Sequence, residues 1–369
     1  MDDLGSIVFD LDRALKETVA RGGSDLHIKV PALPHVRVHG ELEPLSGYEP
    51  IRPTDTEAIR ERLLQSEVKR DQYARQGYAD LSYYTDEGRF RVTCFSQRGS
   101  ASFVFRVISE APKPEGLDIP DVVLSWWNPP RGIVFVTGPT GTGKSTTSAV
   151  LIGLINEHRS CHVVTIEDPI EFVHKDQKAL ISQREVGVDS PSSIEALRAA
   201  LRQDCDVVLV GEIRDEDTAI TAMRAAETGH LVMCTMHTND AGETVQRFVD
   251  LFESRHHALA RQMLAATLIG SVSQRLVPTP KEGRQLNTEV LVNTSRIQDL
   301  IIDGHSTSDF REAIAEGEYY GMHTFDQDLL AHVQAGRVTM EDAIAWATSP
   351  HDFKLMLSGN APRAQRSAA

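Results

Sequence analysis

The stretch from Gly138 to Thr146 reads Gly-Pro-Thr-Gly-Thr-Gly-Lys-Ser-Thr and fits the pattern G-x-x-x-x-G-K-[ST]. It follows the apolar run Gly132 to Thr137, which reads as a buried strand, and it leads into the helical stretch Thr146 to Glu157. In that setting, backbone N–H groups and the helix N-terminus face bound phosphates. A chance match in a loop rich in Gly, Ser and Thr is the alternative, but the strand before it and the helix after it argue against chance. The sequence therefore predicts a nucleoside triphosphate site.

Two residues of this loop have distinct expected roles. We expect Lys144 to reach the β- and γ-phosphates and Ser145 to ligate Mg²⁺, because P-loop NTPases use these two positions in that way. ATP and Mg²⁺ are therefore the predicted cofactors. The predicted nucleotide-binding residues are Gly138, Pro139, Thr140, Gly141, Thr142, Gly143, Lys144, Ser145 and Thr146.

The chain around this loop alternates short apolar runs with helical stretches. Continuous apolar runs are typical of strands buried on both faces, and strands that alternate with helices indicate a parallel sheet in an α/β fold. The predicted strands are 133–137, 162–166, 207–210 and 231–235. The predicted helices are 146–157, 193–203, 216–228 and 242–251. After about Asn293 the chain reads as helices alone.

Acidic residues follow two of the predicted strands, at the edge where open α/β sheets bind ligands. One group is Glu167, Asp168 and Glu171; the other is Glu212, preceded by Gly211 where P-loop NTPases usually carry an Asp. We interpret Glu212 as the base that polarises the attacking water. Mg²⁺ would then depend on the P-loop serine, the phosphates and water, with Glu167, Asp168 and Glu171 as further candidate ligands. The alternative is that these acids only cap helices in solvent.

Two histidines flank the predicted strand 231–235. His230 precedes the strand and His237 follows it. A histidine at a strand end is more often a hydrogen-bonded structural group than a functional one. From the residues alone, both readings stay open for each of them.

The first 110 or so residues read as a small α+β module. One helix is predicted from Ile7 to Val19, ended by Gly22-Gly23, and a second from Thr54 to Arg70. Alternating apolar and polar residues predict strands at 26–30, 36–38, 78–84, 89–95 and 101–108. Three prolines within residues 112–120 predict a linker to the next domain.

Composition narrows the class of protein. The 369 residues suggest two to three domains, and 41% hydrophobic with 25% charged residues is ordinary for a globular chain. A formal net charge of −15 disfavours nucleic acid as a partner. The four cysteines form no C-x-x-C pair, which argues against a zinc module or a disulfide scaffold. The apolar runs are too short to span a bilayer and the N-terminus lacks a signal peptide, so we expect a cytoplasmic protein.

Several further motifs carry a resemblance to a known family. Thr165 to His174 (TIEDPIEFVH) resembles the acidic box of the secretion ATPase superfamily, and Val208 to Asp215 resembles its Walker B segment with Gly in place of Asp. Ala226 to Asn239 resembles its histidine box. With the stretches 24–27, 88–92, 97–99 and 321–327, the chain is similar to the type IV pilus retraction ATPases of the PilT/PilU family over about residues 24–357.

The resemblance implies an architecture and a role. It implies a PAS-like N-terminal domain (1–111) and a RecA-like P-loop ATPase core with a parallel-rich sheet (121–292). The residue pattern adds the linker (112–120), a C-terminal helical region (293–358) and a disordered tail (359–369). The resemblance also implies a homohexameric motor, peripheral at the inner face of the cytoplasmic membrane, that hydrolyses ATP to retract pili and drive twitching motility. The implied partners are an inner-membrane platform protein and a paralogous retraction ATPase.

The resemblance also assigns roles to individual residues. Glu212 is the implied catalytic glutamate, Glu167 and Glu171 belong to the acidic box, and His230 and His237 to the histidine box. Two arginines of the N-terminal domain would meet the γ-phosphate. In this chain they are Arg91 and Arg106.

Reasoning from the residues supports a site completed across a subunit boundary. The motifs of the second domain show no cation for the γ-phosphate besides Lys144, and phosphoryl transfer commonly uses an arginine. Arg89 and Arg91 share one face of a strand, and Arg106 lies on the strand paired with it. The alternative is that these arginines solvate an exposed sheet face.

One departure from the family pattern leaves the retraction role open. The segment Arg296 to Asp303 matches the retraction signature only partly, which favours a PilU-like accessory ATPase as an alternative. A pilus-assembly or type II secretion ATPase is a further alternative, although no cysteines follow Cys234 to form the zinc module that many of those carry. A nucleic-acid translocase and a nucleotide-bound scaffold without turnover complete the competing hypotheses.

Overall fold

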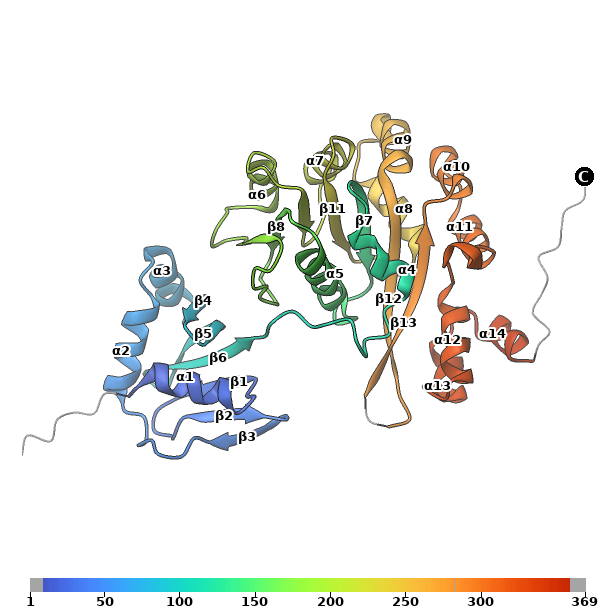
Figure 1. Cartoon of the computed structure of the whole chain (residues 1–369). Helices are drawn as coiled ribbons and strands as arrows, with labels where there is room; N and C mark the ends of the chain where they lie inside the picture. Colours follow the sequence, from blue (N-terminus) through green and yellow to red (C-terminus); the bar gives the residue numbers. More distant parts are fainter. Residues whose placement is uncertain (1–8, 282, 359–369) are drawn as a thin grey trace, which may run out of the picture. The chain divides into compact units, whose positions relative to one another are not determined.

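The computed structural model describes residues 9–281 and 283–358, so Ile7 and the predicted tail 359–369 lie outside the described residues. The chain divides into two compact units, Met1–Glu110 and Ala111–Ala369, which Figure 1 draws in blue-to-cyan and in cyan-to-red. Each unit has its own sheet and its own core, and each is described separately below.

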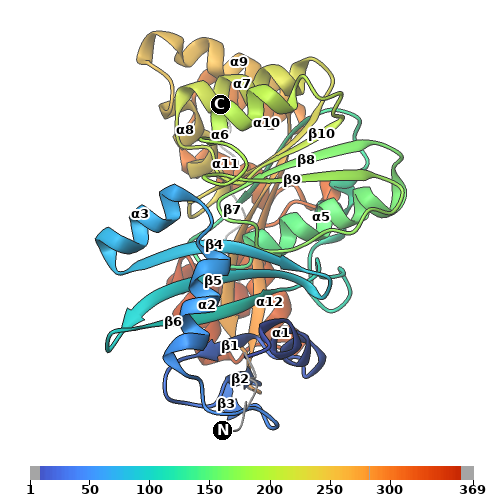
Figure 2. The ribbon, with the colours of Figure 1, turned by 90° about the vertical axis from the view of Figure 1, so that its left-hand side faces the viewer.

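The first unit is an antiparallel six-stranded sheet with three helices. Its strand order is β3-β2-β1-β6-β5-β4. Helices α1 and α2 pack against this sheet (Figure 2) and contribute Leu15 and Ile59 to a core that also holds Phe90, Phe103 and Phe105. The strands are β1 (Asp25–Ile28), β2 (His35–Val38), β3 (Glu41–Pro44), β4 (Tyr78–Thr85), β5 (Gly88–Gln97) and β6 (Ser100–Ile108). The helices are α1 (Leu11–Ala20), α2 (Pro53–Leu63) and α3 (Glu67–Gln76).

The prediction of one helix from Thr54 to Arg70 is wrong. The structure has two helices, because α2 ends at Leu63 and α3 begins only at Glu67. Leu64 leaves the helical conformation with ψ of 58°, and both Leu63 and Leu64 are buried in the core of this unit. The chain leaves the helix at Leu64 and re-enters a helix after Ser66, the N-cap of α3.

The second unit is an α/β fold with a mixed seven-stranded sheet of order β13-β12-β7-β11-β10-β8-β9. All neighbouring strands are parallel except β12 and β13, which form an antiparallel pair. The four apolar runs predicted as parallel strands are confirmed as β7, β8, β10 and β11. The strands are β7 (Gly132–Thr137), β8 (His162–Glu167), β9 (Leu180–Glu185), β10 (Val207–Val210), β11 (Leu231–Met236), β12 (Leu268–Pro278) and β13 (Arg284–Val292).

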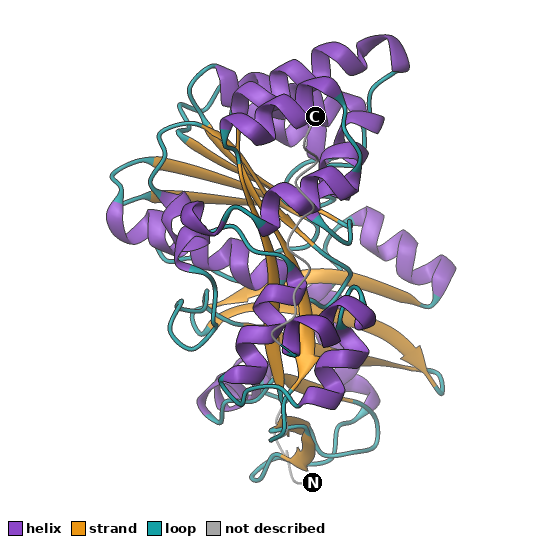
Figure 3. Cartoon of the chain, turned by 90° about the vertical axis from the view of Figure 1, so that its right-hand side faces the viewer, coloured by secondary structure: helices purple, strands orange, loops and turns teal. Residues whose placement is uncertain are grey.

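Helices cover both faces of this sheet (Figure 3). On one face α5 packs with the short helix α4, and on the other α6 to α11 share a core with Phe135, Val208 and Cys234. Strands such as β7 therefore bury every residue, which explains their continuous apolar sequence. The helices are α4 (Asp121–Leu124), α5 (Lys144–His158), α6 (Ser193–Ala200), α7 (Glu216–Glu227), α8 (Ala241–Asp250) and α9 (His257–Thr267).

The region after β13 contains the expected helices. Leu329 of α12 is fully buried and packs with Val277, Val338, Ala343 and Phe353 in a small core of its own. None of the described helices is both long enough and apolar enough to cross a membrane. The helices are α10 (Ser295–Asp303), α11 (Thr307–Ala315), α12 (Phe325–Gln334), α13 (Met340–Trp346) and α14 (Pro350–Leu357).

Candidate functional site

The glycine-rich loop runs from the end of β7 to the start of α5, as its sequence predicts. Gly138, Gly141 and Gly143 have φ of 140°, 81° and 91°, a region that L side chains rarely adopt. A Cβ on Gly138 would lie 2.5 Å from the Gln274 carbonyl oxygen, so the loop passes close to β12. Gly143, the N-cap of α5, brings no side chain to the first N–H groups of the helix. These groups are therefore available to an anion.

Lys144 is buried within this loop. Its ammonium donates hydrogen bonds to the carbonyl oxygens of Gly138, at 2.7 Å, and Pro139, at 2.9 Å, and lies 3.4 Å from His237 Nδ1. Burial lowers the pKa of Lys144, while the negative charges of Glu212 and Glu171 act to raise it. A desolvated cation held by carbonyls at a helix N-terminus is suited to nucleotide phosphates, so the residues present fit ATP.

Glu212 lies two residues after the end of β10 and is only partly exposed. Its Oε2 is 2.5 Å from an Nη atom of Arg214 and 3.6 Å from His237 Nε2. His237 thus lies between Lys144 and Glu212, one contact from each. This places a carboxylate, an imidazole and an ammonium around one point at the carboxyl ends of β10 and β11.

The structure explains why Gly211 stands where related NTPases carry an Asp. The Gly211 N–H donates to the Ile166 carbonyl oxygen at 2.7 Å, and a Cβ on Gly211 would lie 2.8 Å from that same oxygen. Thr235 Oγ1 in addition donates to the carbonyl oxygen of Gly211. The position is closed to any side chain because β8 runs against it.

The acidic box 165–174 is held by β9, a strand that the sequence pattern did not predict. Glu167 Oε1 accepts hydrogen bonds from Thr165 Oγ1, at 2.6 Å, and from Gln183 Nε2, at 3.1 Å. Gln183 also bonds the backbone of Phe172 and His174. The amide of Gln183 therefore fixes both the Glu167 carboxylate and the loop that follows it. Sequence reasoning missed Gln183 because its strand mixes polar and apolar residues without a clear alternation.

A cavity of about 710 Å³ joins these groups. The predicted residues that line it are Thr140, Gly141, Gly143, Lys144, Ser145, Thr146, Glu167, Asp168, Glu171, Glu212 and His237. It is also lined by Arg214 and Arg284. The prediction that Lys144 is the one cation of this unit near the γ-phosphate is therefore wrong. His174 lines the cavity too, and burial lowers the pKa of that imidazole to about 4.

Metal binding by the acids alone is not supported. In residues 9–281 and 283–358, no group of three or more His, Cys, Asp or Glu side chains has the geometry to hold a metal ion. Glu167, Asp168 and Glu171 line the same cavity but do not form a metal centre by themselves. This fits a metal that arrives with the nucleotide and is held largely by its phosphates.

Three of the predicted catalytic residues are not among those that line the cavity. His230 precedes β11, at the opposite end of that strand from His237, and its Nδ1 lies 3.0 Å from the Ala225 carbonyl oxygen. Arg91 and Arg106 belong to the first unit, where they are direct cross-strand partners on β5 and β6. Arg106 Nε donates to Asp25 Oδ1 at 2.9 Å, and the Arg106 side chain is 61% exposed. Arg89, by contrast, is buried, with its guanidinium over the Tyr84 ring.

Comparison with known proteins shows which family the chain is similar to. The family model described as "Type II/IV secretion system protein" matches residues 115–344. The chain is 37% identical to the type IV pilus ATPase PilU of Pseudomonas aeruginosa, over 94% of this chain and 91% of that one. It is 38% identical to the type IV pilus retraction ATPase PilT of the same species, over 93% of this chain and 100% of that one.

A solved structure is also similar to this chain. The crystal structure of the pilus retraction motor PilT with bound ADP superposes with a TM-score of 0.81 at 40% identity, covering 93% of this chain and 98% of that one. The family resemblance stated from the motifs is therefore confirmed. The chain belongs to the type II/IV secretion system protein family, in the group of type IV pilus ATPases that includes PilT and PilU.

Proposed function

We propose that this chain is a motor ATPase that hydrolyses ATP to power type IV pilus retraction and twitching motility. The observation that carries the proposal is the arrangement of Lys144, His237 and Glu212 around one point above the glycine-rich loop. Similarity to PilT over nearly the whole length of both chains supports the same role. The proposed architecture is a RecA-like ATPase domain that follows a PAS-like domain.

The groups have complementary tasks in hydrolysis. Lys144 faces the β- and γ-phosphates and balances charge that spreads over the γ-phosphoryl oxygens in the transition state. Glu212 Oε2 accepts a proton from the attacking water, and His237 lies beside it to orient the γ-phosphate. Ser145 Oγ would hold Mg²⁺, which supplies further neutralisation of the phosphates when bound. Arg214 donates to Oε2 of the same carboxylate and so helps to orient it.

The proposed assembly is a homohexamer at the inner face of the cytoplasmic membrane, acting on a membrane platform protein. In such a ring, Arg91 and Arg106 of one subunit would reach the nucleotide of a neighbour. The exposure of Arg106 supports this role, whereas Asp25 competes for its guanidinium. Mixing Arg91→Ala subunits with Lys144→Ala subunits tests the idea, because some mixed interfaces then pair an intact arginine with an intact loop. No recovery of ATPase activity in demonstrably mixed rings would refute action between subunits.

A PilU-like accessory role is the second candidate, and the partial match of Arg296 to Asp303 favours it. Similarity does not separate the two, since identity to PilU is 37% and identity to PilT is 38%. Deletion of the protein followed by counts of surface pili and a twitching assay distinguishes them. Excess pili without motility supports an essential retractor, and near-normal motility that is lost only under load supports an accessory ATPase. Normal pilus number and motility under all conditions would refute both.

A further inference from the structure

The segment His237–Ala241, here called the His237 loop, runs from the end of β11 to the first residue of α8. Its second residue, Thr238, is buried and its hydroxyl lies 2.6 Å from Thr244 Oγ1 of α8. Thr244 in turn donates to Thr137 Oγ1, at 3.3 Å, at the end of the strand that leads into the glycine-rich loop. Hydroxyl contacts thus tie the His237 loop to the base of the phosphate site.

A buried carboxylate holds the other end of this loop. Glu289 of β13 is 3% exposed, and its Oε1 accepts a hydrogen bond from the Ala241 N–H at 2.9 Å. Glu289 pairs with Ser273 across β12 and β13, and Ser273 Oγ lies 2.8 Å from Thr137 Oγ1. Thr137, which the Thr238 hydroxyl reaches through Thr244, and Glu289, which holds Ala241, are therefore both neighbours of Ser273.

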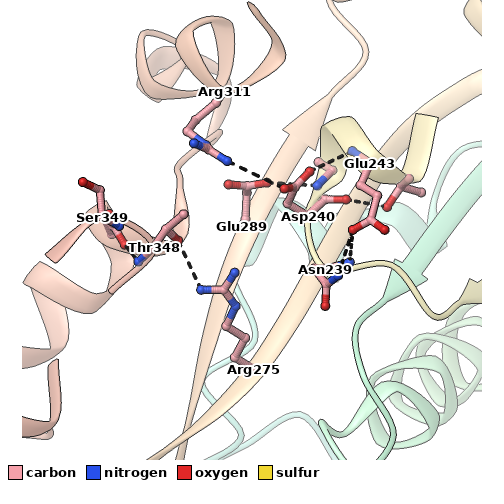
Figure 4. Close-up of polar contacts among 11 residues, drawn as sticks. Asn239, Asp240, Glu243, Arg275, Glu289, Arg311, Thr348 and Ser349 are labelled. Atoms are coloured by element: carbon pink, nitrogen blue, oxygen red, sulfur yellow. Dashed lines mark hydrogen bonds and ion pairs between the residues drawn. The ribbon is translucent and has the colours of Figure 1, made fainter. Parts of the chain in front are cut away.

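Charged groups from three elements surround Glu289 (Figure 4). Asp240 comes from the N-cap of α8, Arg275 from β12 and Arg311 from α11. Burial raises the pKa of Glu289 to about 7; Asp240 also raises it, while the Ala241 N–H and the two arginines lower it. Arg311 is 3.7 Å from Asp240, so it also bridges α11 to the end of the His237 loop.

Arg275 extends this cluster to the C-terminal helices. Its guanidinium lies 3.8 Å from the ring centroid of Phe325, at the start of α12, and donates to Thr348 Oγ1 at 3.1 Å. Asp326 of α12 accepts from the Thr348 N–H at 2.7 Å. Movement of α12 or of the segment before α14 would therefore shift the guanidinium of Arg275, whose charge acts on the Glu289 carboxylate.

We propose that Glu289 is a positioning residue of the ATPase site, which fixes the His237 loop against the glycine-rich loop and links it to the C-terminal helices. This inference rests on the proposed ATPase function. The fold alone does not require an acid at this position, because a neutral side chain with one acceptor would satisfy the Ala241 N–H. An ionised carboxylate in a buried site costs stability, so its presence is explained by what the charge does to the loop.

The test compares Glu289→Gln with the wild type in the full chain, by ATPase kinetics and thermal unfolding from pH 6 to pH 8.5. Gln keeps the acceptor for Ala241 but cannot carry charge. At the alkaline end we expect kcat to fall roughly 2–30-fold, the range found for residues that couple distant parts of a protein. KM for ATP should be unchanged, and the midpoint of unfolding should not drop. Wild-type kcat should rise with pH through about 7, and this step should be missing in Glu289→Gln.

A double-mutant cycle with His237→Ala shows whether Glu289 acts through His237. The double variant should be no slower than His237→Ala alone, since the loop then carries no imidazole to position. Leu15→Ala is the matched control, because Leu15 belongs to the core of the first unit, outside the C-terminal helices, and its loss should lower the unfolding midpoint without removing the pH step. Wild-type kcat and pH profile in Glu289→Gln, or additive effects in the cycle, would overturn this inference alone. An inactive wild type would overturn the proposed function and this inference together.

Discussion

Replacing Gly211 by Ala is a sharp test of how the site is built. Gly211 has an ordinary backbone conformation, so the substitution carries no penalty from φ. The cost is steric: the new Cβ would lie 2.8 Å from the Ile166 carbonyl oxygen and 3.4 Å from Glu167 Cα. That oxygen already accepts the Gly211 N–H, so β8 and β10 cannot separate without losing a ladder hydrogen bond.

The size of the effect follows from known costs of overpacking. Extra methylene groups in a packed interior typically cost about 1–3 kcal/mol. In a unit of this size, each kcal/mol lowers the unfolding midpoint by roughly 2–4 °C. We therefore expect a drop of roughly 2–12 °C by calorimetry, together with a lower kcat because Glu167 and Glu212 flank the contact. Gly211→Asp, which restores the usual Walker B residue, should be at least as damaging.

Gly153→Ala is the matched control for this experiment. Gly153 lies within α5, and a Cβ there would meet no described atom within 4 Å. Replacing an interior helical Gly by Ala should stabilise the protein by about 0.5–1 kcal/mol and leave turnover unchanged. If Gly211→Ala unfolds at the wild-type temperature with wild-type kcat, the argument that β8 closes this position is refuted.

Three other predictions concern the cavity. Lys144→Ala should abolish hydrolysis while circular dichroism stays as in the wild type, because the cation for the β- and γ-phosphates is lost; undiminished turnover would refute the nucleotide site. Glu212→Gln should slow hydrolysis about 10²–10⁴-fold while ATP binding, measured by calorimetry, persists; an equal loss of binding would show a metal or structural role. His174 has its pKa lowered from 6.5 to about 4 by burial, so its native state binds fewer protons than the unfolded state in that interval. Its contribution to stability is present above pH 6.5 and is lost as pH falls toward 4; denaturant unfolding of His174→Asn at pH 7 and pH 4.5 should show a smaller acid loss than the wild type.

Much of the fold follows from local sequence. The runs that become β7, β8, β10 and β11 are continuous apolar stretches because helices cover them on both sides. The strands predicted at 78–84, 89–95 and 101–108 are confirmed as β4, β5 and β6. In the second unit the strands that escaped prediction are β9 and β12–β13, and β12 buries polar groups such as Ser271, Ser273 and Gln274. Their sequences therefore lack the apolar run or the simple alternation that marks a strand.

Some residues of the site could be assigned from short stretches of sequence, and others could not. The glycine-rich loop could be assigned from nine consecutive residues, because its function depends on backbone N–H groups and on positive φ within one turn. The same reasoning placed Glu212 and His237 after their strands, and the structure puts both at the cavity. It also suggested His230, which the structure leaves at the far end of β11.

The sequence by itself determined the nucleotide loop, the parallel strands around it and the family, because each depends on residues close together in the chain. Tertiary structure decided which distant side chains complete the site. Gln183 reaches Glu167, Ile166 excludes a side chain at Gly211, and Glu289 reaches the first N–H of α8. These contacts depend on the order in which strands lie side by side, and strand order is set by burial of the whole sheet between its helices rather than by any local pattern.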